Sequence, residues 1–231
     1  KFISWGWSNK KNKKKISPIG KISHKKSLKV NHYENKKLLI VTCCMPRYSR
    51  DIFSSIISSQ WLNYCNDQFR FINALNQEIK DKTTVRLYPH DYKWNQQLRW
   101  KDKFNTLDYD FGKKTIINQL KQTKIFVSTY NATTFLESIQ MNIPTIMFWD
   151  SNYWELRDEA IPFFKELEKA KIFHNNPESA AKQINIIWNN PKQWWESKQV
   201  RDAISNFKLE FCKESENLIN EVHASLNLNH K

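Results

Sequence analysis

The sequence predicts an α/β fold in which a mostly parallel sheet is flanked by helices and followed by a helical C-terminal tail. Two observations lead to this prediction. Strand-length apolar runs alternate, over short connections, with segments whose apolar residues recur at helical spacing. Residues 125–149 also contain a strand, a polar turn, an amphipathic helix and a second strand in direct succession. Such a succession gives parallel strands, whose carboxyl ends lie at the same edge of the sheet.

The expected strands are apolar runs that stop at polar or turn-forming residues. The first, KKLLIVTCC, is apolar over most of its length, as expected of a strand buried on both faces. The run that Pro144 opens has the same character and ends at Trp149. Residues 93–112 show no regular pattern, and we expect them to be irregular. The expected strands span residues 36–44, 83–88, 125–127, 145–149 and 172–174.

The expected helices carry their apolar residues on one face, as Phe69, Ile72 and Leu75 do in the second of them. Pro162 is expected to interrupt one helix, and Pro177 to lie in the first turn of another. The last helical segment is a charged tail. The expected helices span residues 51–65, 67–80, 113–122, 135–141, 155–170, 177–188 and 192–223.

Positive charge is concentrated at the start of the chain. Of the net charge of +14, +11 lies in residues 1–37, which hold twelve Lys and one Glu. We expect residues 1–35 to be a basic connector and residues 36–231 to form the α/β domain with its tail. A solvated linker is the simpler explanation of the charge, and a patch for anionic lipid head groups is the alternative. The run lacks interleaved aromatic residues and arginines, so we expect no nucleic-acid partner.

Composition excludes several classes of protein. Only three glycines are present, so the sequence holds neither a P-loop nor a GxGxxG turn, and Walker-type ATP chemistry is excluded. The apolar runs are far shorter than a membrane span. The chain begins at Lys1, and we expect it to be part of a longer protein. The four cysteines show no metal-site spacing, which favours a reducing, cytoplasmic location; they are Cys43, Cys44, Cys65 and Cys212.

A hydroxyl-rich turn follows the apolar run 125–127. Six of its seven residues carry a hydroxyl or an amide, and a helix begins directly after them. A helix N-terminus at the carboxyl end of a parallel strand suits a phosphate, because its N–H groups are free and its dipole is positive. The alternative is that Asn131 or Thr133 only caps the helix. The six residues are Ser128, Thr129, Tyr130, Asn131, Thr133 and Thr134.

Three other loops should reach the same edge of the sheet, and they supply guanidinium groups and aromatic rings. Arg86 lies within a strand, which is costly unless its charge is paired or faces a ligand. Glu137 could accept hydrogen bonds from ribose hydroxyls or only favour the helix dipole. Asp108-Tyr109-Asp110 is weak evidence for a metal site, and we expect no metal. The further residues expected to line a site are Arg47, Tyr88, His90, Asp91, Tyr153, Glu155 and Arg157.

Several segments together resemble a bacterial family of transferases of surface-carbohydrate (lipopolysaccharide and capsule) biosynthesis that is related to GT-B glycosyltransferases. The resemblance rests on WGW at 5–7, VRLYPHDYKW at 85–94, residues 126–158, IFHNNPESAAKQIN at 172–185 and QWWES at 193–197. It implies a Rossmann-like domain that is the C-terminal, donor-binding half of a two-domain enzyme. It also implies that Ser128, Thr129, Asn131, Thr133, Thr134 and Glu137 form the donor site. Related transferases carry His-Pro where this chain has Pro89-His90, and no catalytic residue is carried over.

The expected function is therefore a glycosyltransferase-like domain, peripheral at the inner membrane or free in the cytoplasm. It would bind a nucleotide-sugar donor, use a polysaccharide or lipid-linked acceptor and need no cofactor. Arg86 and the turn at 128–134 would neutralise the leaving phosphate. Two alternatives stay open. One is a non-catalytic scaffold or basic membrane-surface adaptor, and the other is a polyol-phosphate transferase that uses a CDP-linked donor.

Overall fold

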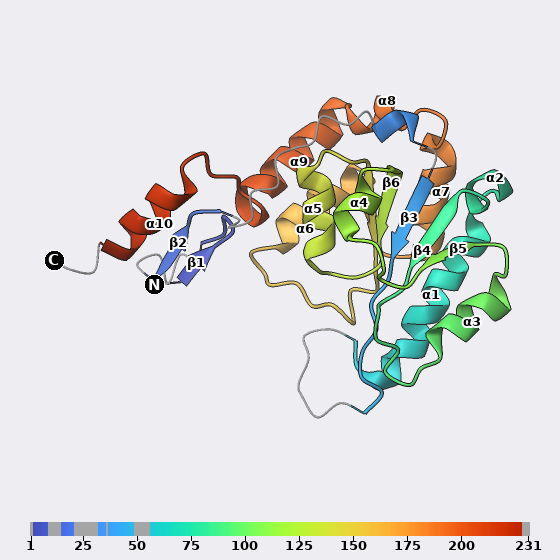
Figure 1. Ribbon diagram of the computed structural model, residues 1–231. Coiled ribbons are helices and arrows are strands. Elements are labelled where there is room, and N and C mark those ends of the chain that lie inside the picture. The colour runs from blue at the N-terminus through green and yellow to red at the C-terminus, as the bar shows by residue number, and fades with distance from the viewer. Residues whose placement is uncertain (1, 9–14, 21–31, 36, 49–55, 228–231) are drawn as a thin grey trace.

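The computed structural model describes residues 2–8, 15–20, 32–35, 37–48 and 56–227. Six strands form one parallel sheet, in the order β5-β4-β3-β6-β7-β8, of which Figure 1 labels β5, β4, β3 and β6. The predicted α/β fold with a mostly parallel sheet is confirmed. The strands are β3 (Lys37–Val41), β4 (Thr83–Arg86), β5 (Asp108–Asp110), β6 (Thr123–Ser128), β7 (Thr145–Phe148) and β8 (Phe173–His174).

The strand order contains one reversal. From β3 the chain adds β4 and then β5 on one side, and it returns to place β6, β7 and β8 on the other. β3 and β6 are therefore neighbours although about eighty residues separate them, and they pair along the whole of β3. Adjacent strands whose connections run in opposite directions leave a crevice at their carboxyl ends, where open parallel sheets bind their ligands.

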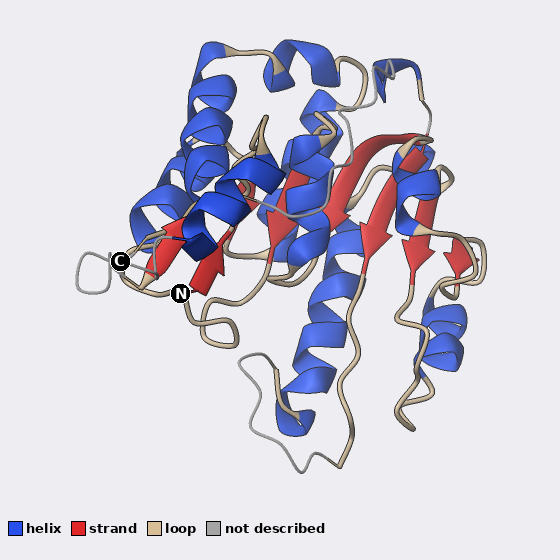
Figure 2. Cartoon of the chain, turned by 60° about the vertical axis from the view of Figure 1, so that its left-hand side comes forward, coloured by secondary structure: helices blue, strands red, loops and turns tan. Residues whose placement is uncertain are grey.

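Helices cover both faces of the sheet (Figure 2). Alternate residues of β3 show why: Leu39 and Val41 belong to one buried cluster, and Leu38 and Ile40 belong to the other. The first cluster includes residues of α5 (Thr133–Gln140), α6 (Ile161–Lys169) and α9 (Lys198–Phe211). The second includes residues of α1 (Trp61–Ala74), α2 (Gln77–Lys80), α3 (Gln96–Lys103) and α7 (Pro177–Ile187).

Two of the predicted segments are different in the structure. Residues 61–74 form one continuous helix instead of two, because buried residues recur along it from Trp61 to Ile72 without a breaker. The part of the predicted first helix at 51–55 lies outside the described residues. Residues 93–112, expected to be irregular, contain α3 and β5. β5 is a polar strand of three residues that pairing with β4 stabilises, and α3 buries little besides Trp100.

Smaller corrections concern the later helices. α4 (Ile116–Leu120) is shorter than predicted, and α6 begins only at Ile161, because Pro162 fits the first turn of a helix and not its interior. The predicted tail is broken into three helices, α8 (Pro191–Trp195), α9 and α10 (Leu218–Asn227). None of the helices within the described residues is long and apolar enough to span a membrane.

The first residues of the chain pack against its last helices. β1 (Phe2–Ser4) and β2 (Ile16–Pro18) form a parallel pair that lies beside α10 in Figure 1. Trp5 accepts a backbone hydrogen bond from Lys213 at 2.8 Å. Gly6, with φ of +139°, comes so close to α9 that a Cβ atom there would lie 2.5 Å from the carbonyl oxygen of Leu209. Of the lysines in residues 1–37, all but Lys15 and Lys37 lie outside the described residues.

All four cysteines are buried, and they form no disulfide with one another. Burial raises the pKa of Cys43, Cys44 and Cys65 to about 12 in each case. These thiols stay protonated at neutral pH, and they contribute to packing as small apolar side chains.

Candidate functional site

The first turn of α5 lies at the carboxyl end of β6 and has no side-chain cap. Ala132 occupies the N-cap position with extended backbone (φ −149°, ψ −177°), and within the described residues the helix has no side-chain cap hydrogen bond. The capping role considered for Asn131 or Thr133 is therefore absent. Side chains do cap α4, α7 and α8, through Thr115, Asn176 and Asn190, whereas α1, α2, α3, α6 and α9 lack such a cap, as α5 does. The free N–H groups of α5 can donate hydrogen bonds to an anion.

A cavity of about 310 Å³ opens at this helix terminus. Its walls come from five parts of the chain: the N-terminal segment, the start of α5, the loop before α6, α6 itself, and α9. Aromatic rings form much of its surface, and they are Trp5, Trp7, Phe135, Phe164, Phe207 and Phe211. The polar residues that line it are Asn131, Thr133, Glu155 and Arg157. The structure therefore brings together four of the residues that the sequence predicts for the site.

Arg157 lies on the rim of this cavity. Its guanidinium carbon is 5.8 Å from the centre of the Trp7 ring, a cation–π distance. Its Nε is 4.0 Å from Glu159 Oε2, and both side chains are largely exposed, so this ion pair holds the arginine only weakly. A second cavity of about 260 Å³ shares Trp7, Arg157 and Phe211 with the first. Arg157 can thus turn toward an anion at the start of α5.

Ser128 and Thr129 lie beneath the site and do not line it. Both are 1% exposed. Ser128 Oγ donates to the carbonyl oxygen of Tyr130 at 2.9 Å, which fixes the turn. Thr129 Oγ1 donates to the carbonyl oxygen of Val41 at 2.9 Å, which joins the ends of β6 and β3. These two residues of the predicted donor site are therefore buried supports that hold the turn and the ends of β3 and β6 together.

Tyr64 of α1 completes this buried junction. Its hydroxyl accepts from the Cys43 backbone N–H at 2.8 Å and lies 2.6 Å from Thr129 Oγ1. Thr129 has one hydroxyl hydrogen, which goes to Val41, so Tyr64 must donate to Thr129. Every donor of the junction is then satisfied. Burial raises the pKa of Tyr64 well above its ordinary value, so the hydroxyl keeps its proton.

Replacing Tyr64 with phenylalanine is expected to lower the free energy of unfolding by about 1–3 kcal/mol, because the buried Cys43 N–H then has no acceptor. Urea unfolding measures the loss. Tyr153→Phe is the matched control, since the Tyr153 hydroxyl accepts only from the exposed Asn63 side chain at 3.1 Å. Equal losses in the two variants would contradict the assigned role of Tyr64.

Arg86 is paired within the protein. Its Nη1 donates to the carboxylate of Asp110, to the Gln119 side chain at 2.8 Å and to the carbonyl oxygen of Lys114 at 2.8 Å. These bonds join β4 to β5 and to α4. Arg86 does not line the cavity at α5, although its positive charge acts on Tyr130, where it opposes the increase in pKa that burial causes.

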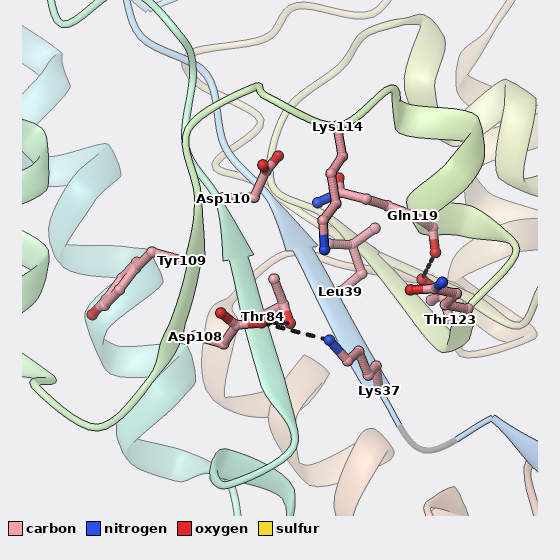
Figure 3. A pocket seen from close by; sticks show the side chains of 10 residues that line it. Lys37, Leu39, Thr84, Asp108, Tyr109, Asp110, Lys114, Gln119 and Thr123 are labelled. Atoms are coloured by element: carbon pink, nitrogen blue, oxygen red, sulfur yellow. Dashed lines mark hydrogen bonds and ion pairs between the residues drawn. The ribbon is translucent and has the colours of Figure 1, made fainter.

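Figure 3 shows the small polar pocket beside this ion pair, of about 70 Å³. Both carboxylates of Asp108-Tyr109-Asp110 are occupied there. Asp108 Oδ2 accepts from Thr84 Oγ1 at 2.9 Å and lies 3.6 Å from Lys37 Nζ, and Asp110 is bound by Arg86. Within the described residues, no three His, Cys, Asp or Glu side chains are grouped to hold a metal ion.

The remaining predicted residues lie on neighbouring elements. Arg47 donates to the carbonyl oxygen of Lys93 at 3.4 Å, and the Asp91 carboxylate accepts from the backbone N–H of Asn95 and of Gln96 at the start of α3. Tyr88 and His90 are exposed on the loop after β4. Thr134 Oγ1 lies 3.4 Å from the Tyr130 hydroxyl, and Glu137 is half-buried one turn further along α5.

Sequence reasoning missed the aromatic walls of the cavity. Trp5 and Trp7 lie more than 120 residues before the turn, and Phe207 and Phe211 lie more than 70 residues after it. The available signal was the Trp5-Gly6-Trp7 motif, in which two tryptophans flank one of only three glycines. The structure shows why that glycine is there: it approaches the backbone of α9 closely.

A family model described as "LIC12162 family transferase" matches residues 1–226. No curated protein matches the chain. Seven solved chains match, among them "Structure of the Wall Teichoic Acid Polymerase TagF, H444N variant", with 13% sequence identity and a TM-score of 0.46. That match covers 86% of this chain and 44% of the solved one, so the chain spans less than half of that protein's length.

Proposed function

The chain belongs to the LIC12162 family of transferases, and from this premise we propose that it binds a nucleotide-activated sugar at the start of α5 and takes part in its transfer to a bacterial surface polysaccharide. The observation that carries the proposal is the uncapped first turn of α5, which opens into an aromatic cavity. A diphosphate would meet the free N–H groups, and the nucleoside would contact the aromatic walls. The cavity volume, about 310 Å³, is within the range of roughly 300–1,000 Å³ of small-molecule sites.

The chemistry of such a transfer requires stabilisation of the leaving diphosphate. The acceptor hydroxyl forms a bond to the anomeric carbon of the sugar and loses its proton to a base. The bond between that carbon and the diphosphate oxygen breaks, and the electron pair leaves with the diphosphate. The α5 terminus and Arg157 would stabilise this negative charge. Arg86 would contribute at a distance, because its Nη1 already binds Asp110, Gln119 and Lys114.

Titration with CMP, CDP, UDP, GDP and their sugar conjugates tests the proposal, read by thermal unfolding and by calorimetry. A ligand that binds only the folded chain stabilises it, by about 2.7 kcal/mol at a hundred times its dissociation constant. We expect one nucleotide diphosphate to raise the Tm, and its nucleoside alone to bind more weakly, because the nucleoside lacks the anion.

Two outcomes would count against the proposal. If none of these nucleotides binds, the α5 terminus is not a donor site. If a CDP-linked donor binds and the product is a phosphodiester instead of a glycoside, the chain is a polyol-phosphate transferase. Mass spectrometry of the product distinguishes these two linkages.

A further inference from the structure

A separate cavity of about 400 Å³ lies at the carboxyl end of β4, and the donor site does not use it. The loop 88–95 and the start of α3 form its walls. Tyr88, Phe111 and Leu98 supply its apolar surface, and Asn95 and Gln97 supply amides. Its volume is within the range of small-molecule sites, roughly 300–1,000 Å³.

Three rings gather on this loop. The centre of the Tyr88 ring is 6.0 Å from that of Tyr92 and 6.2 Å from that of His90, and the His90 and Tyr92 centres are 5.9 Å apart. Tyr88 and Tyr92 are 37% and 36% exposed. Aromatic faces that remain accessible in a cluster can pack against the C–H surface of a ligand ring.

The backbone of the loop is held in an unusual conformation. Of the five residues other than glycine with positive φ in the described chain, three lie here: Tyr92 (50°), Lys93 (68°) and Asn95 (52°). Hydrogen bonds and ring stacking around the loop hold these residues in that conformation. Both oxygens of the Asp91 carboxylate accept backbone N–H groups, at 2.7 and 2.9 Å, and Trp94 stacks on Trp61 at 4.5 Å. Strain that is maintained in this way is typical of preorganised binding loops.

The chemistry of the cavity indicates an uncharged ligand. Asp91 is the one acidic or basic side chain among the described residues that line it, and each of its oxygens already accepts a backbone N–H. No Arg or Lys is among these lining residues, whereas a phosphate or a nucleotide would require a cation or a free helix terminus. Aromatic faces with neighbouring amides suit a neutral sugar ring, which presents an apolar C–H face and hydroxyls that need both donors and acceptors.

Both this cavity and the proposed donor site lie at the carboxyl edge of the sheet. Tyr88 lies two residues beyond β4, Tyr130 lies two residues beyond β6, and only β3 separates these strands. Two strand spacings correspond to about 10 Å. The Tyr130 hydroxyl is in turn 3.4 Å from Thr134 Oγ1 in the first turn of α5.

We propose that this cavity binds a neutral sugar ring of the carbohydrate that accepts the transferred group. The assignment of this sugar to the acceptor rests on the proposed function, whereas the binding of a sugar does not. Tyr88 would stack on the ring, and Asn95 and Gln97 would bind its hydroxyls.

Saturation-transfer NMR on the full chain tests this proposal, with the methyl glycosides of glucose, galactose, N-acetylglucosamine and rhamnose as probes. We expect the ring protons of at least one glycoside to receive saturation. Tyr88→Leu should weaken that binding by roughly two- to tenfold, because an aromatic contact is lost. Gln97→Ala should weaken it as well, and this exposed residue can be replaced without affecting the core.

Tyr48→Leu is the matched control, since Tyr48 is a tyrosine on the loop after β3, is 77% exposed and lies outside the cavity. If no glycoside receives saturation, or if Tyr88→Leu and Tyr48→Leu behave alike, the proposal is wrong. It is also wrong if Tyr88→Leu abolishes nucleotide binding, because the cavity then belongs to the donor site. Sugar binding without any nucleotide binding would overturn the proposed function and leave the sugar site standing.

Discussion

Replacing Thr133 with aspartate is expected to weaken nucleotide binding about a hundredfold or more without destabilising the chain. Thr133 is the first residue of α5, is exposed and lines the cavity. A carboxylate there interacts favourably with the helix dipole, by about 0.3–1 kcal/mol. The same carboxylate repels a bound diphosphate. Two unit charges 4 Å apart interact by about 4 kcal/mol near a protein surface, and each 1.4 kcal/mol is about a tenfold change in affinity. Solvent at this exposed position screens the repulsion, and for that reason the expected loss of affinity is about a hundredfold and not the larger factor that 4 kcal/mol would give.

Thr133→Asn is the control for this prediction, because asparagine has the shape of aspartate without its charge. Calorimetric titration of the two variants with the nucleotide identified for the wild-type chain separates charge from shape. The Asn variant should bind within a few-fold of wild type. If the Asp variant binds as tightly as the Asn variant, the phosphate does not lie at the start of α5, and the donor site must be sought elsewhere.

Acid is expected to destabilise the fold through His174 by about 3 kcal/mol between pH 7 and pH 4. This histidine on β8 is 6% exposed. Its Nε2 lies 3.1 Å from the carbonyl oxygen of Lys171 and must carry the hydrogen, since a carbonyl only accepts. Its Nδ1 is 2.8 Å from Ser179 Oγ. Burial lowers the pKa of His174 from 6.5 to about 4, so the folded chain holds it neutral.

The direction of the pH effect follows from the protonation of His174 in the unfolded and in the folded chain. Below pH 6.5 the unfolded chain takes up a proton on this histidine, and the folded chain does not until about pH 4. The contribution of His174 to stability is therefore complete above pH 6.5 and is lost as the pH falls toward 4. Urea unfolding at several pH values, with His174→Gln as the reference that cannot titrate, measures it. The wild-type chain should lose about 3 kcal/mol more than the variant, and parallel curves would refute the assignment.

The sequence predicts the strands that are buried on both faces, because an apolar run such as Leu38–Val41 is a local pattern. β5 is not predictable in this way. Asp108 and Asp110 form a strand only because β4 pairs with them and because Lys37, Thr84 and Arg86 bind their carboxylates. The adjacency of β3 and β6 is likewise absent from any local pattern, since it depends on the path of the chain between them.

The candidate site was predictable in its position but not in its composition. The polar turn after a buried strand indicated Asn131 and Thr133; both line the cavity, and their role in donor binding stays a prediction. Ser128 and Thr129 have the same chemistry and are nearly inaccessible, because they continue the strand into the interior and bind its neighbours. Residue type alone cannot distinguish a lining hydroxyl from a supporting one. That distinction depends on the course of the backbone, which decides whether a hydroxyl faces the cavity or the interior.

The close approach of Gly6 to α9 has a consequence for the order in which the molecule folds. The cavity at α5 is complete only when Trp5 and Trp7 meet Phe207 and Phe211, which are about two hundred residues away along the chain. Contacts of such separation carry a large loop-closure entropy and form after the sheet has brought the intervening chain together. Ligand-binding competence should therefore be the last property that a refolding chain acquires, later than its secondary structure and its buried core.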